Sequence, residues 1–167
     1  MKTLWVATFI LAGVGACGHS DTMMSDYAQA IDRHMDALQT EETAHASEIA
    51  SLSTLGAIRD AEAGHSQRMD DHLDEMRLVM RDMAGCRSST LVDNAGFADS
   101  TQKIRFECDD HLQAMELAPG LAAARNEETR HGGAFHDVMV VMRGQWNMMM
   151  MDSSGYACSS HCTYRGM

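Results

Sequence analysis

Apolar residues recur along this chain at spacings of three and four positions, which is the pattern of amphipathic helices. Four segments carry the pattern and predict helices that start near residues 20–25 and end at about 51, then cover about 55–84, 100–117 and 121–151. Residues 51–56 and Ala118-Pro119-Gly120 predict short turns, and residues 86–100, rich in Ser, Asn, Asp and Gly, predict a loop. We therefore expect an all-α protein, an up-down-up-down four-helix bundle over residues 25–151.

Histidines interrupt the apolar stripe of every predicted helix. They stand at positions where the pattern calls for Leu or Val. A single buried histidine is commonly satisfied by hydrogen bonds, but six of them are hard to satisfy in a dry core. The pattern predicts a polar centre lined by His34, His45, His65, His72, His111 and His131.

Each predicted helix also carries one acid or thiol three residues before a histidine, and residues three apart share a helix face. Counted from the two short turns at ~1.5 Å per residue, these side chains fall into two layers about one helical turn apart. One layer holds His45, Glu62, His111 and Glu128; the other holds Glu42, His65, Cys108 and His131.

Such layers predict a site for one or two transition-metal ions. A thiolate with several imidazoles favours copper or zinc, with iron possible. The arrangement also resembles that of ferritin-like di-iron proteins, in which two helices give Glu-x-x-His and two give a lone Glu. This resemblance implies a dinuclear oxidase or peroxidase as an alternative, although the Cys-x-x-His pair at 108–111 departs from that pattern.

A second phrase repeats at 31–38, 69–76 and 108–115, reading IDRHMDAL, MDDHLDEM and CDDHLQAM. Duplication of a helical hairpin would produce such repeats. Because His34 and His72 fall at similar depth, they predict a possible second metal site, with Met35, Met69 or Met76 as further ligands. Methionine is an ordinary core filler, yet the run Met148–Met151 would also suit copper.

The first twenty residues have the layout of a secretory signal, with an apolar run too short to span a bilayer. Within them, Val14-Gly15-Ala16-Cys17 resembles the lipobox of bacterial lipoproteins. The resemblance implies a signal peptide over 1–16, a lipid on Cys17 and a tether over 17–24. With Gly18 next, it also implies an outer-membrane location facing the periplasm. The alternative is an ordinary signal peptide with an incidental cysteine.

The remaining cysteines indicate which disulfides can form, and the net charge limits the classes of binding partner. An exported protein permits disulfides, and we expect Cys86 to pair with Cys158 or Cys162 of the irregular tail, 152–167. Cys108 should lie roughly 30 Å deeper and stay a thiol. The formal net charge of −11 has the wrong sign for binding nucleic acid.

The leading hypothesis is a lipid-anchored envelope protein that sequesters, buffers or transfers copper or zinc. A metal donor or acceptor protein is a possible partner. The alternatives are the dinuclear oxidase or peroxidase, a structural or interaction lipoprotein whose histidines bond to glutamates, and a b-type haem bundle.

Overall fold

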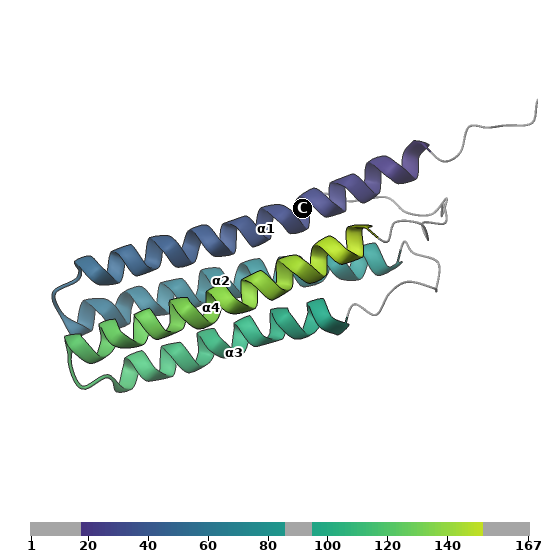
Figure 1. Ribbon diagram of the computed structural model, residues 1–167. Helices are drawn as coiled ribbons and strands as arrows, with labels where there is room; N and C mark the ends of the chain where they lie inside the picture. The colour runs from purple at the N-terminus through teal and green to yellow at the C-terminus, as the bar shows by residue number, and fades with distance from the viewer. Residues whose placement is uncertain (1–17, 86–94, 152–167) are drawn as a thin grey trace, which may run out of the picture.

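The computed structural model describes residues 18–85 and 95–151, and within them the chain is helical except for two short turns (Figure 1). The helices are α1 (Gly18–Ser51), α2 (Leu55–Gly85), α3 (Ala95–Leu117) and α4 (Leu121–Met151). The described residues contain no strand, so the all-α prediction is confirmed. No described helix combines the length and the apolarity that crossing a membrane requires.

Each helix packs against two others. α1 and α3 both lie against α2 and α4, and the two short turns lie at the same end of the molecule (Figure 1). At the first turn, the Thr54 hydroxyl accepts a hydrogen bond from the Ala57 N–H (3.2 Å) and caps α2. At the second, Pro119 has no N–H and disfavours a helical residue before it, so α3 ends at Leu117.

Two arginines tie the hairpins to each other at this end. The Arg59 guanidinium donates to the Glu116 and Ala118 carbonyls at the end of α3 (2.7 and 3.3 Å). The Arg125 guanidinium donates in the same way to Leu52 at the end of α1 (2.9 Å). Arg59 and Arg125 are 66 positions apart, and the same separation pairs 42 with 108, 45 with 111, 62 with 128 and 65 with 131. The hairpins α1–α2 and α3–α4 therefore match, as a duplicated hairpin would.

The core consists of two apolar clusters with a polar band between them. A small cluster near the turns includes Ile49, Ile58 and Met115. A larger one fills the other end of the bundle, where the Trp146 indole N–H donates to Asp32 (2.9 Å). Five methionines are buried or partly buried there as core residues: Met76, Met80, Met83, Met139 and Met142. In the run 148–151, only Met149 is buried and Met148 and Met151 are exposed.

The loop predicted over residues 86–100 extends too far toward the C-terminus, because α3 already begins at Ala95. Phe97 is buried with its ring 5.7 Å from that of Trp146, and the Ser100 hydroxyl donates to the Gln145 side chain (2.8 Å). These contacts with α4 stabilise a helical turn that its local Asn, Asp and Gly content disfavours. At the other end of the chain, α1 begins at Gly18, so residues expected as a tether are helical.

Several predictions concern residues outside the described ranges. These are the signal peptide, the lipobox with Cys17, the disulfide of Cys86 with Cys158 or Cys162, and the tail.

Candidate metal centre

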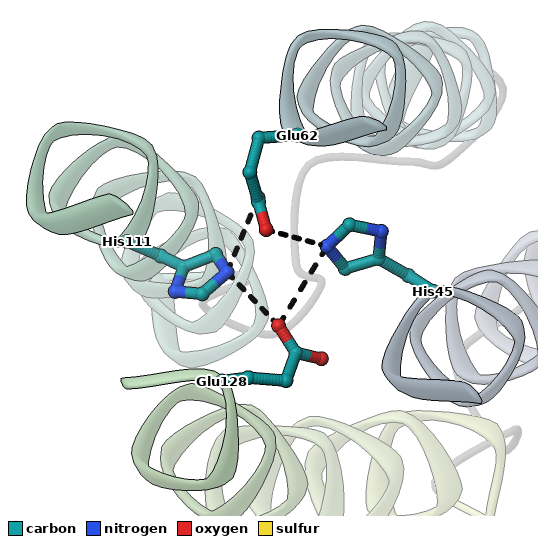
Figure 2. A group of neighbouring side chains, drawn as sticks. All are labelled: His45, Glu62, His111 and Glu128. Carbon is teal, nitrogen blue, oxygen red and sulfur yellow. Dashed lines mark hydrogen bonds and ion pairs between the residues drawn. The ribbon is translucent and has the colours of Figure 1, made fainter. Parts of the chain in front are cut away.

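Four buried side chains, one from each helix, converge near the turn end of the bundle (Figure 2). We call them the first group: His45, Glu62, His111 and Glu128. The His45 Nε2 atom lies 2.8 Å from a Glu62 oxygen and 3.6 Å from Glu128. The His111 Nε2 atom lies 3.2 Å from Glu62 and 3.3 Å from Glu128. Each carboxylate therefore faces two imidazole nitrogens, and the whole predicted layer is brought together.

The second layer forms only in part. Glu42, His65 and His131, which we call the second group, have ligand atoms within 4.8 Å of one another. One Glu42 oxygen lies 3.4 Å from the Nε2 atom of both histidines. Cys108, the fourth residue predicted here, is a buried free thiol in the larger apolar cluster and does not belong to this group. Burial, and then the charge of Glu42, raise the pKa of the Cys108 thiol to about 12.

The two groups lie directly on each other. The His45 and His65 rings stack with centroids 3.9 Å apart, and the His111 and His131 rings stack with centroids 4.1 Å apart. The interplanar angles are 5° and 11°. The stacks thus form two matching columns, one from each hairpin, and they connect the groups into one centre.

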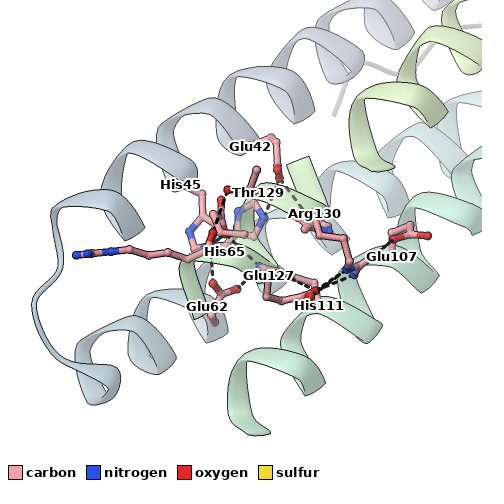
Figure 3. A network of polar contacts seen from close by, with 12 residues as sticks. Glu42, His45, Glu62, His65, Glu107, His111, Glu127, Thr129 and Arg130 are labelled. Atoms are coloured by element: carbon pink, nitrogen blue, oxygen red, sulfur yellow. Dashed lines mark hydrogen bonds and ion pairs between the residues drawn. The ribbon is translucent and has the colours of Figure 1, made fainter. Parts of the chain in front are cut away.

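The repeated phrase EET-x-H, at 41–45 and 127–131, places a further carboxylate outside this centre. Its first residue, Glu41 or Glu127, approaches a histidine of the neighbouring helix. Glu41 lies 3.4 Å from the His65 Nδ1 atom, and Glu127 lies 3.4 Å from the His111 Nδ1 atom (Figure 3). An imidazole whose Nδ1–H donates to a carboxylate presents its Nε2 lone pair inward, the arrangement usual for metal-binding histidines.

Arginines hold both outer carboxylates in place. The Arg68 guanidinium lies 2.6 Å from Glu41. The Arg130 guanidinium lies 2.7 Å from Glu127 (Figure 3). The hydrogen bonds from Arg130 are the main cause of the lowered pKa of Glu127. Glu41 and Glu127 were not among the predicted site residues, although the doubled glutamate in both copies of the phrase was a signal for them.

Charge in the centre is balanced between carboxylates and imidazoles. Burial disfavours ionisation of Glu62, but hydrogen bonding and charge from His111 and His45 outweigh it and lower the Glu62 pKa to about 2. His131 and His65 outweigh burial in the same way and lower the Glu42 pKa to about 2. Burial also opposes charge on His111, yet Glu128 and Glu62 raise its pKa to about 10. Without a metal ion, Glu62 and Glu128 therefore face a protonated His111.

Hydrogen bonds alone do not satisfy this centre. Nine buried side-chain atoms of the described residues have no hydrogen bond of good geometry, and all nine belong to the two groups. Five of the nine lie 3.2–3.6 Å from an oppositely charged side chain of the same groups. The other four are one oxygen of Glu42, one oxygen of Glu128, and the Nδ1 atoms of His45 and His131. A buried polar atom without a partner costs about 1–3 kcal/mol. A cation bound between these atoms would satisfy several of them at once.

A separate group lies closer to the surface. The Nδ1 atoms of His34 and His72 are 3.4 Å apart, and the His34 Nε2 atom lies 3.3 Å from Glu75. We call this the outer group. Sequence analysis predicted both histidines but missed Glu75, which stands three positions after His72 and shares its face. The proposed methionine ligands are fully buried in the larger apolar cluster: Met35, Met69 and Met76.

Comparisons of the chain with protein-family models, with curated proteins and with solved structures found no match. The assignment of function therefore depends on the geometry of these groups.

Proposed function

We propose that this chain binds transition-metal ions in the first and second groups, enclosed by an up-down-up-down bundle. One observation carries the proposal: nine buried nitrogen and oxygen atoms of the two groups lack a hydrogen bond of good geometry, and the groups draw on all four helices. A structural role for these residues would favour a network in which every buried polar atom is satisfied. Two histidines also have outer carboxylates on Nδ1, which supports a ligand role for their Nε2 atoms.

The donor atoms favour zinc over copper. The expectation of copper or zinc drew on a thiolate from Cys108 together with the imidazoles, and the run Met148–Met151 also suited copper. Neither the Cys108 sulfur nor a methionine belongs to the two groups. The first group supplies two imidazoles and two carboxylates, which is a four-ligand set suited to Zn²⁺. Imidazole and carboxylate also accommodate Cu²⁺ and iron. We therefore place zinc first and retain copper as the second choice.

The proposed cellular role is to sequester, buffer or transfer the metal in a bacterial envelope. A lipid on Cys17, implied by the lipobox resemblance, would hold the protein on the outer membrane and facing the periplasm. A donor or acceptor protein would then exchange metal with it. The second group has three ligands rather than four, so an ion there would retain an open position for exchange.

Metal content and titration test the proposal directly. The mature protein, purified without a tag, should carry about one or two zinc ions per chain by mass spectrometry, because two buried groups are present. Calorimetric titration of the metal-free protein should detect the same number of tight sites. The variant His45→Ala/His131→Ala should lose them, whereas His136→Ala, on an exposed histidine of α4, should retain them. Equal binding by both variants, or no binding by the natural chain, would reject the proposal.

The stacking of the two groups favours one alternative, a dinuclear oxidase or peroxidase. Ring pairs about 4 Å apart bring the groups as close together as the ligands of a two-metal site. The test is to load the protein with iron(II) in the absence of oxygen and then to mix it with oxygen. An oxidase would consume oxygen, and the variant His45→Ala/His131→Ala would not. Zinc retention together with no oxygen or peroxide consumption would favour sequestration.

A further inference from the structure

A groove of about 270 Å³ runs between α1 and α4 and reaches the metal centre. Glu128, a member of the first group, lines it, so one inner carboxylate borders a surface opening. Small side chains make up much of the rest. The lining includes Ala46, Ala50, Arg125, Glu128, Thr129 and Gly132.

The matching face of the molecule, between α2 and α3, carries larger residues opposite the α1 side of the groove. Sixty-six positions separate matched residues, so Leu112 stands where the groove has Ala46, and Glu116 stands where it has Ala50. Leu112 is partly buried. The exposure of the matched glutamates differs in the same direction. Glu62 on the α2–α3 side is 1% exposed, and Glu128 on the groove side is 6% exposed. The α1–α4 side of the centre is therefore less covered than the α2–α3 side at these positions.

Gly132 brings the second group to the same groove. A Cβ atom at this position would lie 3.4 Å from a Glu42 oxygen, so the glycine backbone is adjacent to that carboxylate. Glycine inside a helix is destabilising relative to alanine. Its matched position on the other face is Ser66. Gly132 therefore leaves space beside Glu42, which is 7% exposed, while both histidines of the second group are at most 1% exposed.

Charge at the opening suits a cation. The guanidinium of Arg125 is turned to the Ala50 and Leu52 carbonyls at the end of α1 (3.4 and 2.9 Å), which offset its charge. Glu128 and Glu42 are carboxylates, and in each of them one oxygen faces two histidines while the other has no hydrogen-bond or ion-pair contact with a described residue. An arriving divalent cation would therefore meet available oxygen ligands before it met the deeper imidazoles.

We propose that the α1–α4 groove is the route by which a hydrated divalent cation enters and leaves the centre, with Glu128 as its first inner ligand. The inference rests on the proposed metal-binding function and adds the path and the order of ligands. The side chain at position 46 sets the width of the path, and Leu112 closes the equivalent path on the opposite face.

Exchange kinetics in designed variants test the route. Ala46→Leu copies the residue of the closed face, and Ala44→Leu places the same bulk on an exposed position of the same helix. Zinc uptake by metal-free protein, and zinc release to a fluorescent chelator, would be followed by stopped flow. Ala46→Leu should slow both rates by at least about tenfold. Its equilibrium affinity should stay within about twofold of the natural chain, because a change in the path alone affects the forward and reverse barriers equally.

Two further variants keep the test decisive. Gly132→Ser copies Ser66 of the closed face and should also slow exchange, even if leucine at position 46 disturbs the packing. Adding Leu112→Ala to Ala46→Leu should restore fast exchange by opening the opposite face. Natural exchange rates in both Ala46→Leu and Gly132→Ser, with metal still bound at the centre, would overturn the route and leave the proposed function intact. Absence of zinc binding by the natural chain would instead reject the proposed function.

Discussion

His111 should make the largest contribution to the pH dependence of the folding stability. Burial disfavours charge on this imidazole, but Glu128 and Glu62, at 3.3 and 3.2 Å, raise its pKa from 6.5 to about 10. The metal-free folded protein therefore keeps a proton that the unfolded chain loses above pH 6.5. Because the folded-state pKa is the higher one, the stabilisation is complete below pH 6.5 and is lost as the pH rises through about 10.

The pKa values set the size of the effect. A difference of one in pKa between folded and unfolded states corresponds to ~1.36 kcal/mol. The rise to about 10 gives a ceiling of roughly 5 kcal/mol for His111. Since the neighbouring imidazoles share the same carboxylates, we expect a loss of roughly 2–4 kcal/mol in the free energy of unfolding between pH 6.5 and 9.5. The lowered pKa values of Glu42 and Glu62, about 2, act at the acid end. Their stabilisation is present above pH 4.5 and is lost toward pH 2, so maximum stability should fall between pH 4.5 and 6.5.

Urea denaturation of the metal-free protein, followed by far-UV circular dichroism between pH 5 and 9.5 with a chelator present, measures this dependence. Saturating zinc should reverse the slope, because the metal replaces the proton and binds more tightly as the imidazoles deprotonate. His111→Asn lacks the titrating imidazole and should flatten the alkaline limb of the metal-free curve. A natural chain whose metal-free stability is constant or rising from pH 6.5 to 9.5 would refute the assignment of a buried proton to His111.

Three other predictions follow from the packing. Replacing all three residues of the second group with leucine should stabilise the metal-free protein by ~1–4 kcal/mol, since buried charged networks are often less stable than apolar packing. A lower urea midpoint than that of the natural chain would contradict this. Arg59→Met and Arg125→Met should each lower the free energy of unfolding by about 1 kcal/mol, since each removes matched hydrogen bonds to helix-end carbonyls. Unequal losses, measured by urea denaturation, would show that the two hairpins differ at these contacts. His72→Ala should remove a weaker zinc site in calorimetry and leave the inner sites unchanged, and an unchanged isotherm would exclude the outer group.

The helices could be predicted because their ends are determined locally. Thr54 caps α2 and Pro119 ends α3, and both signals are visible in a few consecutive residues. Depth counting from these turns then placed the first group correctly, since the two turns lie at the same end of the bundle and each helix rises evenly from them. The start of α3 was predicted incorrectly because contacts of Phe97 and Ser100 with α4 override the local composition.

The position of the Cys108 side chain and the roles of Glu41 and Glu127 could not be predicted from helical spacing. Counting gives the height of a side chain and its face, but not how far its tip reaches. The Cys108 side chain is short and packs in the apolar cluster, whereas the longer Glu42 reaches the imidazoles of the second group. The roles of Glu41 and Glu127 depend on which neighbouring helix lies beside them, and that arrangement is set by the bundle as a whole.

The two hairpins match at the residues of the first group and differ at residues of, or next to, the second group. In the first group the hairpins contribute matching residues, a histidine from α1 and α3 and a glutamate from α2 and α4. Two differences between the hairpins fall beside the second group, where Cys108 matches Glu42 and Ser66 matches Gly132. A pair of hairpins selected for packing alone would have no reason to leave four helical positions of one layer polar and alike while opening a single face beside the other. Two layers that bind metal, with a groove on one face through which the ion enters and leaves, would account for both.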